Sequence, residues 1–474
     1  LTSSTVPSTL KSATVTPLLI KSTLNSEDMK SYRPVSNLPY VSKLVEKIVV
    51  KRLNAHMSSH SLHEYYQSAY RMYHSTETAL LRVHSDILQA VDNKKCVFLV
   101  LLDQSAAFDT VDHSILLRRL EESVGVSSQA LDWCRSYFAG RSQSVLIHGV
   151  QSVPRPLTCG MPQGSVVGPF GFPTYSAPVG EICVKHGINY HFYADDTQLY
   201  VAFDPSEEAE ALQRMEAYIA EIREWMRTNH LKLNETKSEF LIIGSNAQVR
   251  QLSKQGITIG EAVVQPSQSA RNIGAIFDSN LSMKDHVNSL CRSCYCHLRN
   301  IGKIRKSLTK DAAITLIHAF VASKLDHLNA LLYGVPKYLL QKLQKIQNNS
   351  ARIVTRTKRR EHITPIMKSL HWLPIKMRIQ FKINLTTFKA LTGFAPGYIR
   401  DLLEPYRPPR ALRSLNLSLL KKPKCRTKTF GDRSYVTCAP HLWNQLPHSL
   451  RQCIDVDAFK SGLKCHLFQQ AYSD

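Results

Sequence analysis

Short apolar runs and amphipathic stretches alternate over the first 280 residues of the chain. The clearest run, Cys96–Leu102, has the length and the unbroken apolar composition of a buried strand. From Asp285 to about Leu403, apolar residues instead recur at helical spacing, with lysine and glutamine between them. The pattern therefore predicts an α/β module followed by a mostly helical one.

The same periodicity places individual elements. Helices are expected over Val41–Leu53, Glu77–Leu88, Leu116–Leu120, Ala130–Phe138 and, with Ser206 as N-cap, through Met226. Strands are expected at Cys96–Leu102, Ile188–Tyr193, Glu239–Ile243, Ile257–Val264 and Ile273–Phe277. Residues 1–31 are rich in serine, threonine and leucine, and we expect them to form a loosely structured, partly disordered lead-in.

Positive charge is concentrated in the second half of the chain. The chain has 60 lysines and arginines against 37 aspartates and glutamates, and residues 301–474 hold 31 against 9 of them. That segment therefore carries 22 of the 23 net positive charges. Such a basic surface usually follows a phosphate backbone, although an ordinary solvated surface is compatible with the same composition.

Other features of the sequence bear on the cellular compartment of the protein and on the extent of its reading frame. No apolar run approaches the roughly 20 residues of a bilayer-spanning helix, so a membrane is not expected as a partner. The 11 scattered cysteines, an odd number, indicate reduced thiols and an intracellular setting. The chain opens on Leu1 rather than methionine, and we expect it to be a fragment of a longer reading frame.

Two of the predicted strands end on acidic residues. Asp103 follows one strand, and Asp195 and Asp196 follow another. A carboxylate at the end of a buried strand is costly unless it is paired or bound to a cation, and three together suit Mg²⁺. Two such ions can activate a hydroxyl nucleophile and stabilise a leaving phosphate. Taken separately, the same residues are also compatible with a strand-end cap and a hairpin turn.

Ordered motifs connect these carboxylates to a known family. They are YRPVSNL at 32–38, QSAYR at 67–71, LLDQSAAFD at 101–109 followed by Asp112-His113, GMPQGS at 160–165, YADD at 193–196, Leu233-Asn234 with Lys237, and Asn272-Ile273-Gly274. In this order they resemble the two finger motifs and motifs A to E of reverse transcriptases, in the form found in LINE-type (non-LTR) retrotransposons. The segments Phe430–Ser434 and Pro440–Pro447 are similar to the tails of Jockey-like elements.

The resemblance implies an α+β fold of the right-hand polymerase type. Its parts would be a lead-in (1–31), fingers and a palm with an antiparallel sheet (32–280), a helical thumb and connection (281–405), and a basic, helical C-terminal extension (406–474). The implied reaction is RNA-directed DNA synthesis with two Mg²⁺ ions. The implied partners are an RNA template, a DNA primer or target and dNTPs, in a cytoplasmic ribonucleoprotein and in the nucleus.

Site residues are carried over from the matching motifs. The implied catalytic residues are the metal-holding Asp103, Asp195 and Asp196, with Lys237 as a proton donor to pyrophosphate. The implied nucleotide-binding residues are Arg71 for the triphosphate, Phe108 as a steric gate against a ribose 2′-hydroxyl, and Gln163 and Gly164. The implied template and primer contacts are Arg33, Tyr193 and Gly274.

Several of these residues also have a purely structural interpretation. Phe108 is compatible with an ordinary core aromatic, and Lys237 with an ordinary solvated lysine. Asp109 and Asp112 are expected to be local caps or surface carboxylates. Cys291, Cys294, Cys296 and His297 suggest zinc by type, but cysteines at helical spacing in an apolar stretch are usually buried structure.

The chain departs from the family pattern after motif B. Where the family continues with an apolar helix, this chain has FGFPTYSA at 170–177. Within a helix, Gly171 would cost about 1 kcal/mol and Pro173 about 3 kcal/mol relative to alanine. Ala69 and Met72-Tyr73 are further departures. The alternative to an active polymerase is therefore a catalytically dead remnant that still binds nucleic acid.

Other polymerase classes fit less well. The end of motif A and the tail argue against an intron maturase or a telomerase-like enzyme, and Phe108 and Tyr193-Ala194 argue against an RNA-dependent RNA polymerase. No endonuclease motif is visible. Because a LINE endonuclease precedes the polymerase, we expect it to be separate or missing.

Overall fold

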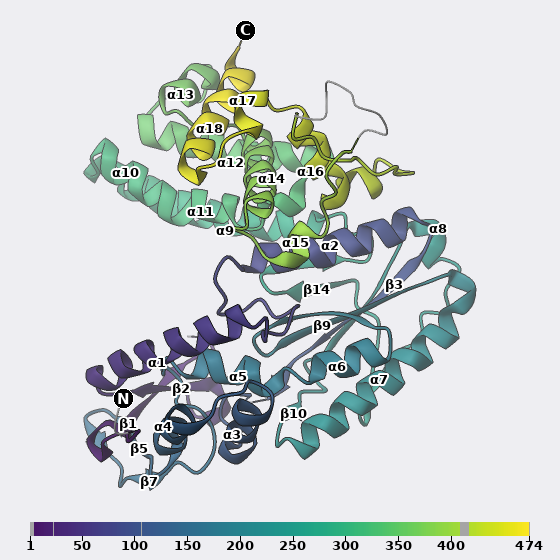
Figure 1. Cartoon of the computed structure of the whole chain (residues 1–474). Coiled ribbons are helices and arrows are strands. Elements are labelled where there is room, and N and C mark those ends of the chain that lie inside the picture. Colours follow the sequence, from purple (N-terminus) through teal and green to yellow (C-terminus); the bar gives the residue numbers. More distant parts are fainter. Residues whose placement is uncertain (1–3, 22, 106, 408–416, 474) are drawn as a thin grey trace.

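The computed structural model describes residues 4–21, 23–105, 107–407 and 417–473, so Ala106 of motif A lies outside it. An α/β half and a helical half lie against each other, with helix α2 (Thr76–Asp92) at their boundary (Figure 1). The predicted α+β class and the change from mixed to helical structure near residue 284 are both confirmed. None of the described helices is both long and apolar enough to cross a membrane.

A four-stranded antiparallel sheet forms the centre of the α/β half. Its order is β11 (Glu239–Ile243), β3 (Cys96–Leu102), β9 (Asp196–Phe203) and β8 (Asn189–Tyr193). Both faces of the sheet are buried: Val97 and Leu99 join one hydrophobic core, and Phe98 and Val100 join the other. A strand buried on both faces carries an unbroken apolar run, which is why β3 and β11 could be predicted to the residue.

Helices cover the face of the sheet on which Phe98 and Val100 lie. They are α1 (Tyr40–Ser59), α3 (His113–Glu122), α4 (Ser128–Phe138), α5 (Gly168–Ser176), α6 (Val179–Lys185) and α7 (Glu208–Thr228). The expected N-cap of α7 is wrong. Pro205 begins a 3₁₀ turn that contains Ser206, and Glu207 stands at the N-cap position. The fixed φ of proline starts the turn before Ser206 can cap it.

A second sheet corrects the expectation for residues 1–31. Strand β1 (Ser12–Leu19) pairs antiparallel with β2 (Tyr32–Asn37) and parallel with β5 (Ser142–Ile147). The short strands β6 (Val150–Gln151) and β7 (Arg155–Pro156) extend the sheet along β5. β1 contributes few buried apolar residues, so the sequence gives little hydrophobic signal. Its threonines and valine nevertheless suit a strand whose backbone is paired on both sides.

Smaller elements complete the α/β half. The pair β4 (Gln104–Ser105) and β10 (Lys232–Leu233) follows β3, and helix α8 (Asn246–Val249) follows β11. Two hairpins come next: β12 (Ile257–Ile259) with β13 (Ala262–Val264), and β14 (Ser269–Asn272) with β15 (Ala275–Asp278). The strand expected over Ile273–Phe277 therefore starts later, because Ile273 and Gly274 form a turn with positive φ.

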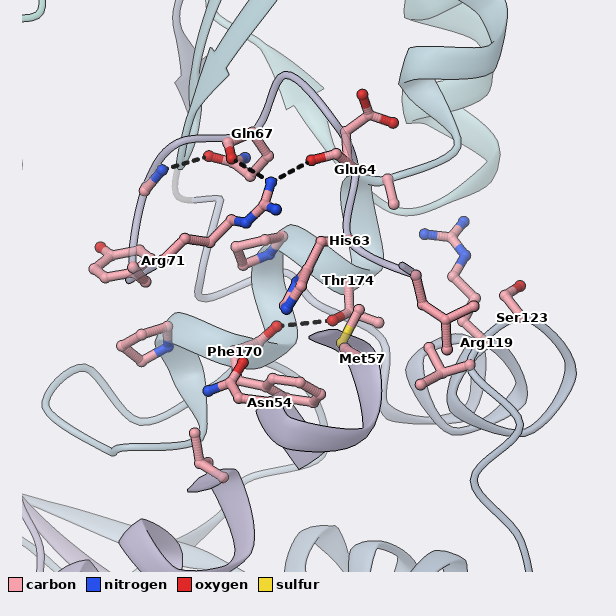
Figure 2. Close-up of a pocket in the computed structure, with 18 of the residues that line it drawn as sticks. Asn54, Met57, His63, Glu64, Gln67, Arg71, Arg119, Ser123, Phe170 and Thr174 are labelled. Carbon is pink, nitrogen blue, oxygen red and sulfur yellow. Dashed lines mark hydrogen bonds between the residues drawn. The ribbon is translucent and has the colours of Figure 1, made fainter. Parts of the chain in front are cut away.

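The helix after motif B forms despite its glycine and proline. Pro173 lies inside α5, and α6 begins after Ala177 and Pro178. Within α5, Thr174 Oγ1 donates a hydrogen bond to the Phe170 carbonyl at 2.9 Å (Figure 2). The cost predicted for Gly171 and Pro173 does not prevent this helix.

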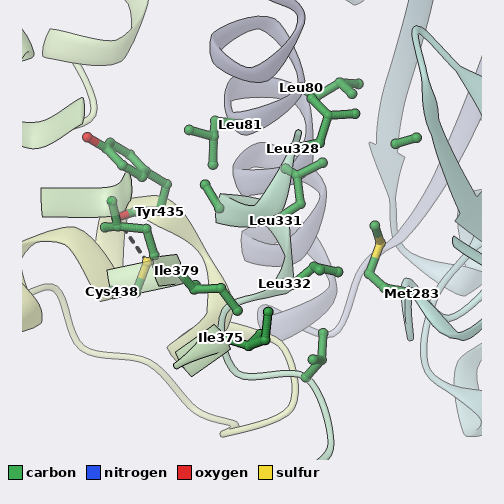
Figure 3. Packing of buried hydrophobic residues seen from close by; sticks show 14 of the residues in the cluster. Leu80, Leu81, Met283, Leu328, Leu331, Leu332, Ile375, Ile379, Tyr435 and Cys438 are labelled. Atoms are coloured by element: carbon green, nitrogen blue, oxygen red, sulfur yellow. Dashed lines mark hydrogen bonds between the residues drawn. The ribbon is translucent and has the colours of Figure 1, made fainter. Parts of the chain in front are cut away.

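The helical half shares one core with the other face of the sheet. Its main helices are α9 (Lys284–Ile304), α10 (Lys310–Ile317), α12 (Lys337–Thr355), α13 (Ile363–Ser369), α14 (Ile375–Leu391), α16 (Tyr435–Asn444) and α18 (Val456–Tyr472), with the short α11 (Ser323–Asp326), α15 (Gly397–Arg400) and α17 (His448–Arg451) between them. Leu80 and Leu81 of α2, Ile379 of α14 and Tyr435 of α16 all belong to this core, in which Leu80 lies near Leu328 (Figure 3).

The C-terminal segment is part of this core and is not simply appended to it. Phe459 of α18 stacks on Phe388 of α14, with ring centroids 4.1 Å apart. Arg433 Nη2 donates to the Leu281 carbonyl at 2.7 Å, which joins the expected extension to the start of the expected thumb. Leu99 of β3 and Leu339 of α12 lie in the same hydrophobic core, on opposite sides of the expected palm–thumb boundary. The boundaries predicted at residues 280 and 405 therefore do not separate independent hydrophobic cores.

Pro173 provides a test of the energetics of α5. Pro169 lies in the first turn, where no intrahelical N–H bond is lost, whereas Pro173 lies in the interior. Replacing Pro173 with alanine should raise the free energy of unfolding by about 2 kcal/mol. Pro169→Ala serves as the matched control and should lower it by up to about 1 kcal/mol, because alanine gives the unfolded chain more conformational freedom. The free energy of unfolding is measured by urea denaturation. Equal changes for Pro173→Ala and Pro169→Ala would mean that Pro173 does not destabilise α5.

Candidate active site

The sheet brings the three predicted aspartates to one edge. Asp195 lies in the turn of the β8–β9 hairpin, where Tyr193 pairs with Asp196 and Ala194 has a φ of +57°. In the neighbouring pair, Leu102 of β3 lies opposite Thr197 of β9. The residues that continue these two strands, Asp103 and Asp196, therefore lie side by side. The hairpin expected from the YADD string is confirmed.

Burial and mutual repulsion raise the pKa values of two of these carboxyls. Burial raises the pKa of Asp196 to about 6, with further contributions from Asp195 and Asp103. The pKa of Asp195 is also raised, first by burial and then by Asp103, while the charge of Arg33 acts in the opposite direction. The sheet edge therefore holds more negative charge than its neighbours compensate, which favours a bound cation.

Two residues of the expected motif D contact Asp103. Asn234 donates from its backbone N–H to the Asp103 carbonyl (2.8 Å) and from Nδ2 to Asp103 Oδ2 (3.1 Å). Lys237 Nζ lies 3.9 Å from Asp103 Oδ2, and its side chain is largely exposed. Lys237 is thus placed beside the carboxylates by the β4–β10 pairing, which fixes the loop that follows β10.

The donor set suits a hard divalent cation. The three carboxylates offer only oxygen atoms, and Mg²⁺ is usually held by one or two carboxylates together with water and substrate phosphate. Over the described ranges, no three or more histidine, cysteine or acidic side chains, the three aspartates included, are arranged so that they alone could hold a metal ion. Substrate phosphate and water would have to complete the coordination of any Mg²⁺ bound by these carboxylates.

The motif B loop is fastened to the end of motif A. Gly160 N donates to the Val111 carbonyl (2.7 Å), and Met161 N donates to that of Phe108 (2.8 Å). Gly160 has a φ of +81°, and a Cβ atom there would lie 2.5 Å from the Asp109 carbonyl oxygen. Only glycine allows this close approach, which explains why the loop begins with it.

The same loop presents Gln163 and Gly164 next to the first finger motif. Gln163 Nε2 donates to both carboxylate oxygens of Asp109, at 3.0 and 3.1 Å. The backbone carbonyl of Gln163 accepts a hydrogen bond from Ser36 N at 2.8 Å. Partial burial raises the pKa of Asp109, while the hydrogen bond from Gln163 and the charge of Arg33 act in the opposite direction. The structure thus brings Arg33, Gln163 and Gly164 together. Asp109 is exposed, as expected for a surface carboxylate, and it also anchors Gln163.

Asp112 and Phe108 have simpler surroundings. Asp112 caps α3 by accepting a hydrogen bond from Ile115 N at 2.9 Å, as predicted. The half-buried ring of Phe108 stacks on Phe172 of α5, with centroids 4.9 Å apart. The packing interpretation of Phe108 is therefore correct for one of its faces, and its role as a steric gate stays a prediction.

Arg71 lies in an adjoining cavity of about 580 Å³ between α1, α5 and the second finger motif (Figure 2). Its Nη1 donates to the carbonyls of Glu64 (2.7 Å) and Gln67 (3.0 Å). Burial lowers the pKa of Arg71, and the carboxylate that counteracts this effect is Glu64. The guanidinium is thus engaged with the backbone, and its contact with a triphosphate stays a prediction.

The sequence did not reveal that Gln67 holds the aspartate hairpin. The Gln67 side chain is 2% exposed; its Oε1 accepts from Ala194 N (3.0 Å) and its Nε2 donates to the Ala194 carbonyl (3.3 Å). Ser68 N also donates to the Phe192 carbonyl of β8 at 3.0 Å. Gln67 therefore fixes the strained residue that precedes Asp195. Its place in the QSAYR string was the only available signal.

A second missed contact reaches β8 from the helical half. Ser68 Oγ lies 2.8 Å from His191 Nε2 and 2.7 Å from the hydroxyl of Tyr398 in α15. The Tyr398 hydroxyl also donates to Thr78 Oγ1 of α2 at 3.1 Å. Burial lowers the pKa of His191 to about 3, so the ring is neutral. Tyr398 thus ties the helical half to the strand that leads into Asp195.

The remaining predicted residues lie around this centre. Tyr193 borders Asp196, whose charge contributes to the raised pKa of the tyrosine. Gly274, with a φ of +102°, lines a cavity of about 520 Å³ together with Arg271 and Lys324. The hairpin that carries it is fixed to β9, since Asn272 Nδ2 donates to Gln198 Oε1 at 2.7 Å.

The cysteine group on α9 is divided between environments. Cys294 is buried in the core, Cys296 is exposed, and His297 stacks on Phe320 with centroids 5.4 Å apart. Burial raises the pKa of Cys294 to about 11. These residues pack with the helix core or face away from it, as helical spacing implies.

Removing one of the negative charges at the sheet edge should raise the stability of the fold, and the size of this gain should depend on pH. A carboxyl with a higher pKa in the folded than in the unfolded chain stabilises the fold while protonated. This contribution is lost as the pH rises through the folded-state value, about 6 for Asp196. Asp196→Asn should therefore raise Tm at pH 8, and the gain should shrink as the pH falls below 6. The exposed Asp132→Asn should give no gain, and a pH-independent effect of Asp196→Asn would contradict the prediction.

Comparison with known proteins agrees with these motifs. Residues 21–276, more than half of the chain, match the family model for reverse transcriptase (RNA-dependent DNA polymerase). The probable RNA-directed DNA polymerase from transposon BS of Drosophila melanogaster is 28% identical over 69% of this chain and 36% of its own length. The corresponding X-element protein of the same organism is 25% identical over 86% of this chain and 43% of its own length.

The chain thus spans less than half the length of these relatives. The RNA-directed DNA polymerase from mobile element jockey of Drosophila funebris is 26% identical over 69% of this chain and 36% of its own length. Among solved structures, apo telomerase from Candida tropicalis is 10% identical at a TM-score of 0.43, over 78% of this chain and 63% of that one. As its motifs predict, the chain belongs to the reverse transcriptase family, and its relatives place it with the polymerases of LINE-type (non-LTR) retrotransposons.

Proposed function

We propose that this chain is an RNA-directed DNA polymerase that adds dNTPs to a primer 3′-hydroxyl on an RNA template. The observation that carries the proposal is the convergence of Asp103, Asp195 and Asp196 at one sheet edge, in the order expected for the family. Reverse transcriptases generally use divalent metal ions. Two Mg²⁺ ions bound here would supply activation of the primer hydroxyl and charge stabilisation of the leaving pyrophosphate.

The chain's own residues would divide the remaining tasks. Asp103 and Asp195 would hold the ions, with Asp196 contributing to the second ion or to its surroundings. Lys237, whose Nζ lies 3.9 Å from Asp103 Oδ2, would protonate the leaving pyrophosphate. The loop of Gln163 and Gly164 would line the nucleotide, because it lies between Arg33 and the end of motif A.

Selection of nucleotide and strand would depend on residues around the aspartates. Phe108 would exclude a ribose 2′-hydroxyl with the ring face that Phe172 leaves uncovered. Arg71 would have to exchange its backbone carbonyls for a triphosphate. Arg33, Tyr193 and Gly274 would contact template and primer. The basic helical half would follow the nucleic-acid backbone, in a cytoplasmic ribonucleoprotein and in the nucleus.

Primer extension tests the proposal directly. Purified protein with an annealed DNA primer, an RNA template, dNTPs and Mg²⁺ should extend the primer, and Asp195→Asn should reduce the rate at least 10³-fold, because one metal ligand is lost. The Asp132→Asn variant, which replaces a surface carboxylate, should extend the primer at the rate of the parent protein. RNA binding without extension by the parent protein would instead identify a catalytically dead remnant.

Gln67 gives a second prediction about the same reaction. Gln67→Met keeps the volume but removes both hydrogen bonds to Ala194, so the turn before Asp195 loses its support. We expect kcat for nucleotide incorporation to fall about 10–100-fold. The KM for dNTP and the affinity for RNA should change little. Gln89→Met on α2 is the matched control, and an unchanged kcat in Gln67→Met would show that the clamp has no catalytic consequence.

A further inference from the structure

A second cavity lies between the finger loop and the helical half and has no part in the proposed reaction. It has a volume of about 670 Å³ and is bordered by the segment from Tyr73 to Thr78, by α14 and by Lys464 of α18. This volume lies within the range of pockets that hold small ligands or single groups of larger ones. The cavity is therefore large enough to accept a nucleotide-sized group.

The acidic side chains of this cavity are already paired. Lys382 Nζ lies 2.9 Å from Glu77 Oε2, and Glu77 Oε1 also accepts from Ala330 N. Asp326 accepts two hydrogen bonds from Arg378, one of them from Nε at 2.7 Å. Neither carboxylate is left to neutralise further positive charge.

Two other lysines add positive charge to the same cavity. Within the described part of the chain, neither Lys389 nor Lys464 has a carboxylate within ion-pair distance. Burial lowers the pKa of Lys389, and the charges of Lys460 and Lys382 lower it further. Burial lowers the pKa of His318, another lining residue, and the charges of Arg378 and then Lys464 lower it further. An anion bound here would relieve this repulsion.

Exposed aromatic rings stand at the rim of the cavity. Tyr73 and Phe394 meet edge to face, with centroids 5.5 Å apart, and are 47% and 38% exposed. Exposed rings beside unpaired lysines are the combination with which proteins bind single-stranded nucleic acid, since bases stack on the rings and phosphates meet the lysines. A duplex would keep its bases stacked inside and away from these rings.

We propose that this cavity binds a short, unpaired segment of single-stranded RNA, at a place separate from the three-aspartate site. Lys389 and Lys464 would contact phosphate, and Tyr73 or Phe394 would stack on a base. The choice of RNA over DNA rests on the proposed function, in which RNA is the template. Because Tyr73 follows Arg71 by two residues, the same loop would border both the nucleotide and the RNA strand.

The salt dependence of RNA binding tests the lysines. Fluorescence anisotropy with a labelled, unstructured RNA oligonucleotide is measured over a range of salt concentrations, without dNTPs. In Lys389→Ala/Lys464→Ala, the slope of log K against log salt should be shallower by about 1.4, since each phosphate contact contributes about 0.7. The exposed pair Arg250→Ala/Lys254→Ala is the charge-matched control and should keep the parent slope. An unchanged slope in the cavity variant overturns the proposal.

The aromatic rings are tested by a separate variant. Tyr73→Ala/Phe394→Ala should weaken RNA binding about 5–100-fold while leaving the salt slope unchanged, because stacking releases no counterions. Duplex RNA should bind all variants alike. Equal losses for single-stranded DNA and RNA would overturn the assignment to RNA, and unaltered binding by the aromatic variant would overturn base stacking.

These outcomes are independent of catalysis. The binding assay contains no nucleotide substrate and is repeated in the Asp195→Asn background, so a failure of primer extension leaves the result interpretable. Lys389 is repelled by its neighbours, and its removal should not lower Tm. A thermal melt of each variant therefore separates loss of binding from loss of folding.

Discussion

Three carboxylates at one sheet edge repel one another, and much of the surrounding structure serves to keep them there. The raised pKa values of Asp195 and Asp196 reflect the energetic cost of burying these carboxylates next to one another. The restraint comes from backbone pairing, because β3 is held between β9 and β11 and its end is fixed beside the hairpin. The sheet in turn is stabilised by burial on both faces, with a separate hydrophobic core on each side. Gln67 adds a local restraint on Ala194, whose left-handed backbone would otherwise relax.

The helical half also contributes to this restraint. Tyr398 comes from a short helix more than 190 residues after the hairpin, yet its hydroxyl meets Ser68, which in turn meets His191 on β8. Because all three side chains are buried, breaking one contact leaves polar groups without a partner inside the protein. One hydrophobic core that runs from Leu80 to Leu467 explains why such a contact is possible, since residues of α2 pack in it together with strands of the sheet and helices of the helical half. The α/β half and the helical half are thus held together by shared packing and hydrogen bonds, and they do not form separate units.

The features that could be predicted from the sequence depend on local composition, whereas those that were missed depend on contacts between residues far apart in the chain. The strands Cys96–Leu102 and Glu239–Ile243 were predicted to the residue because burial on both faces leaves an unbroken apolar run. The aspartates were identified because three carboxylates that follow such runs stand in motifs that occur in the order seen in reverse transcriptases. β1 was missed because its stability comes from pairing with two distant strands, which leaves little trace in local composition. Gln67 and Tyr398 were missed as restraints for the same reason: their partners lie 127 and 330 residues away in sequence.

The departures from the family pattern after motif B have a structural explanation in packing. A Cβ atom on Gly171 would lie 2.4 Å from Met161 Cε and 2.9 Å from its Sδ, so the methionine of the motif B loop fills the space beside the glycine. Phe172 stacks on Phe108, and Thr174 and Ser176 hydrogen-bond to carbonyls within α5. The intrinsic cost of glycine and proline is therefore opposed by close packing against the end of motif A. Such compensation is specific to this loop and helix, and it places the Gln163 side chain on Asp109 while the helix beneath it stays formed.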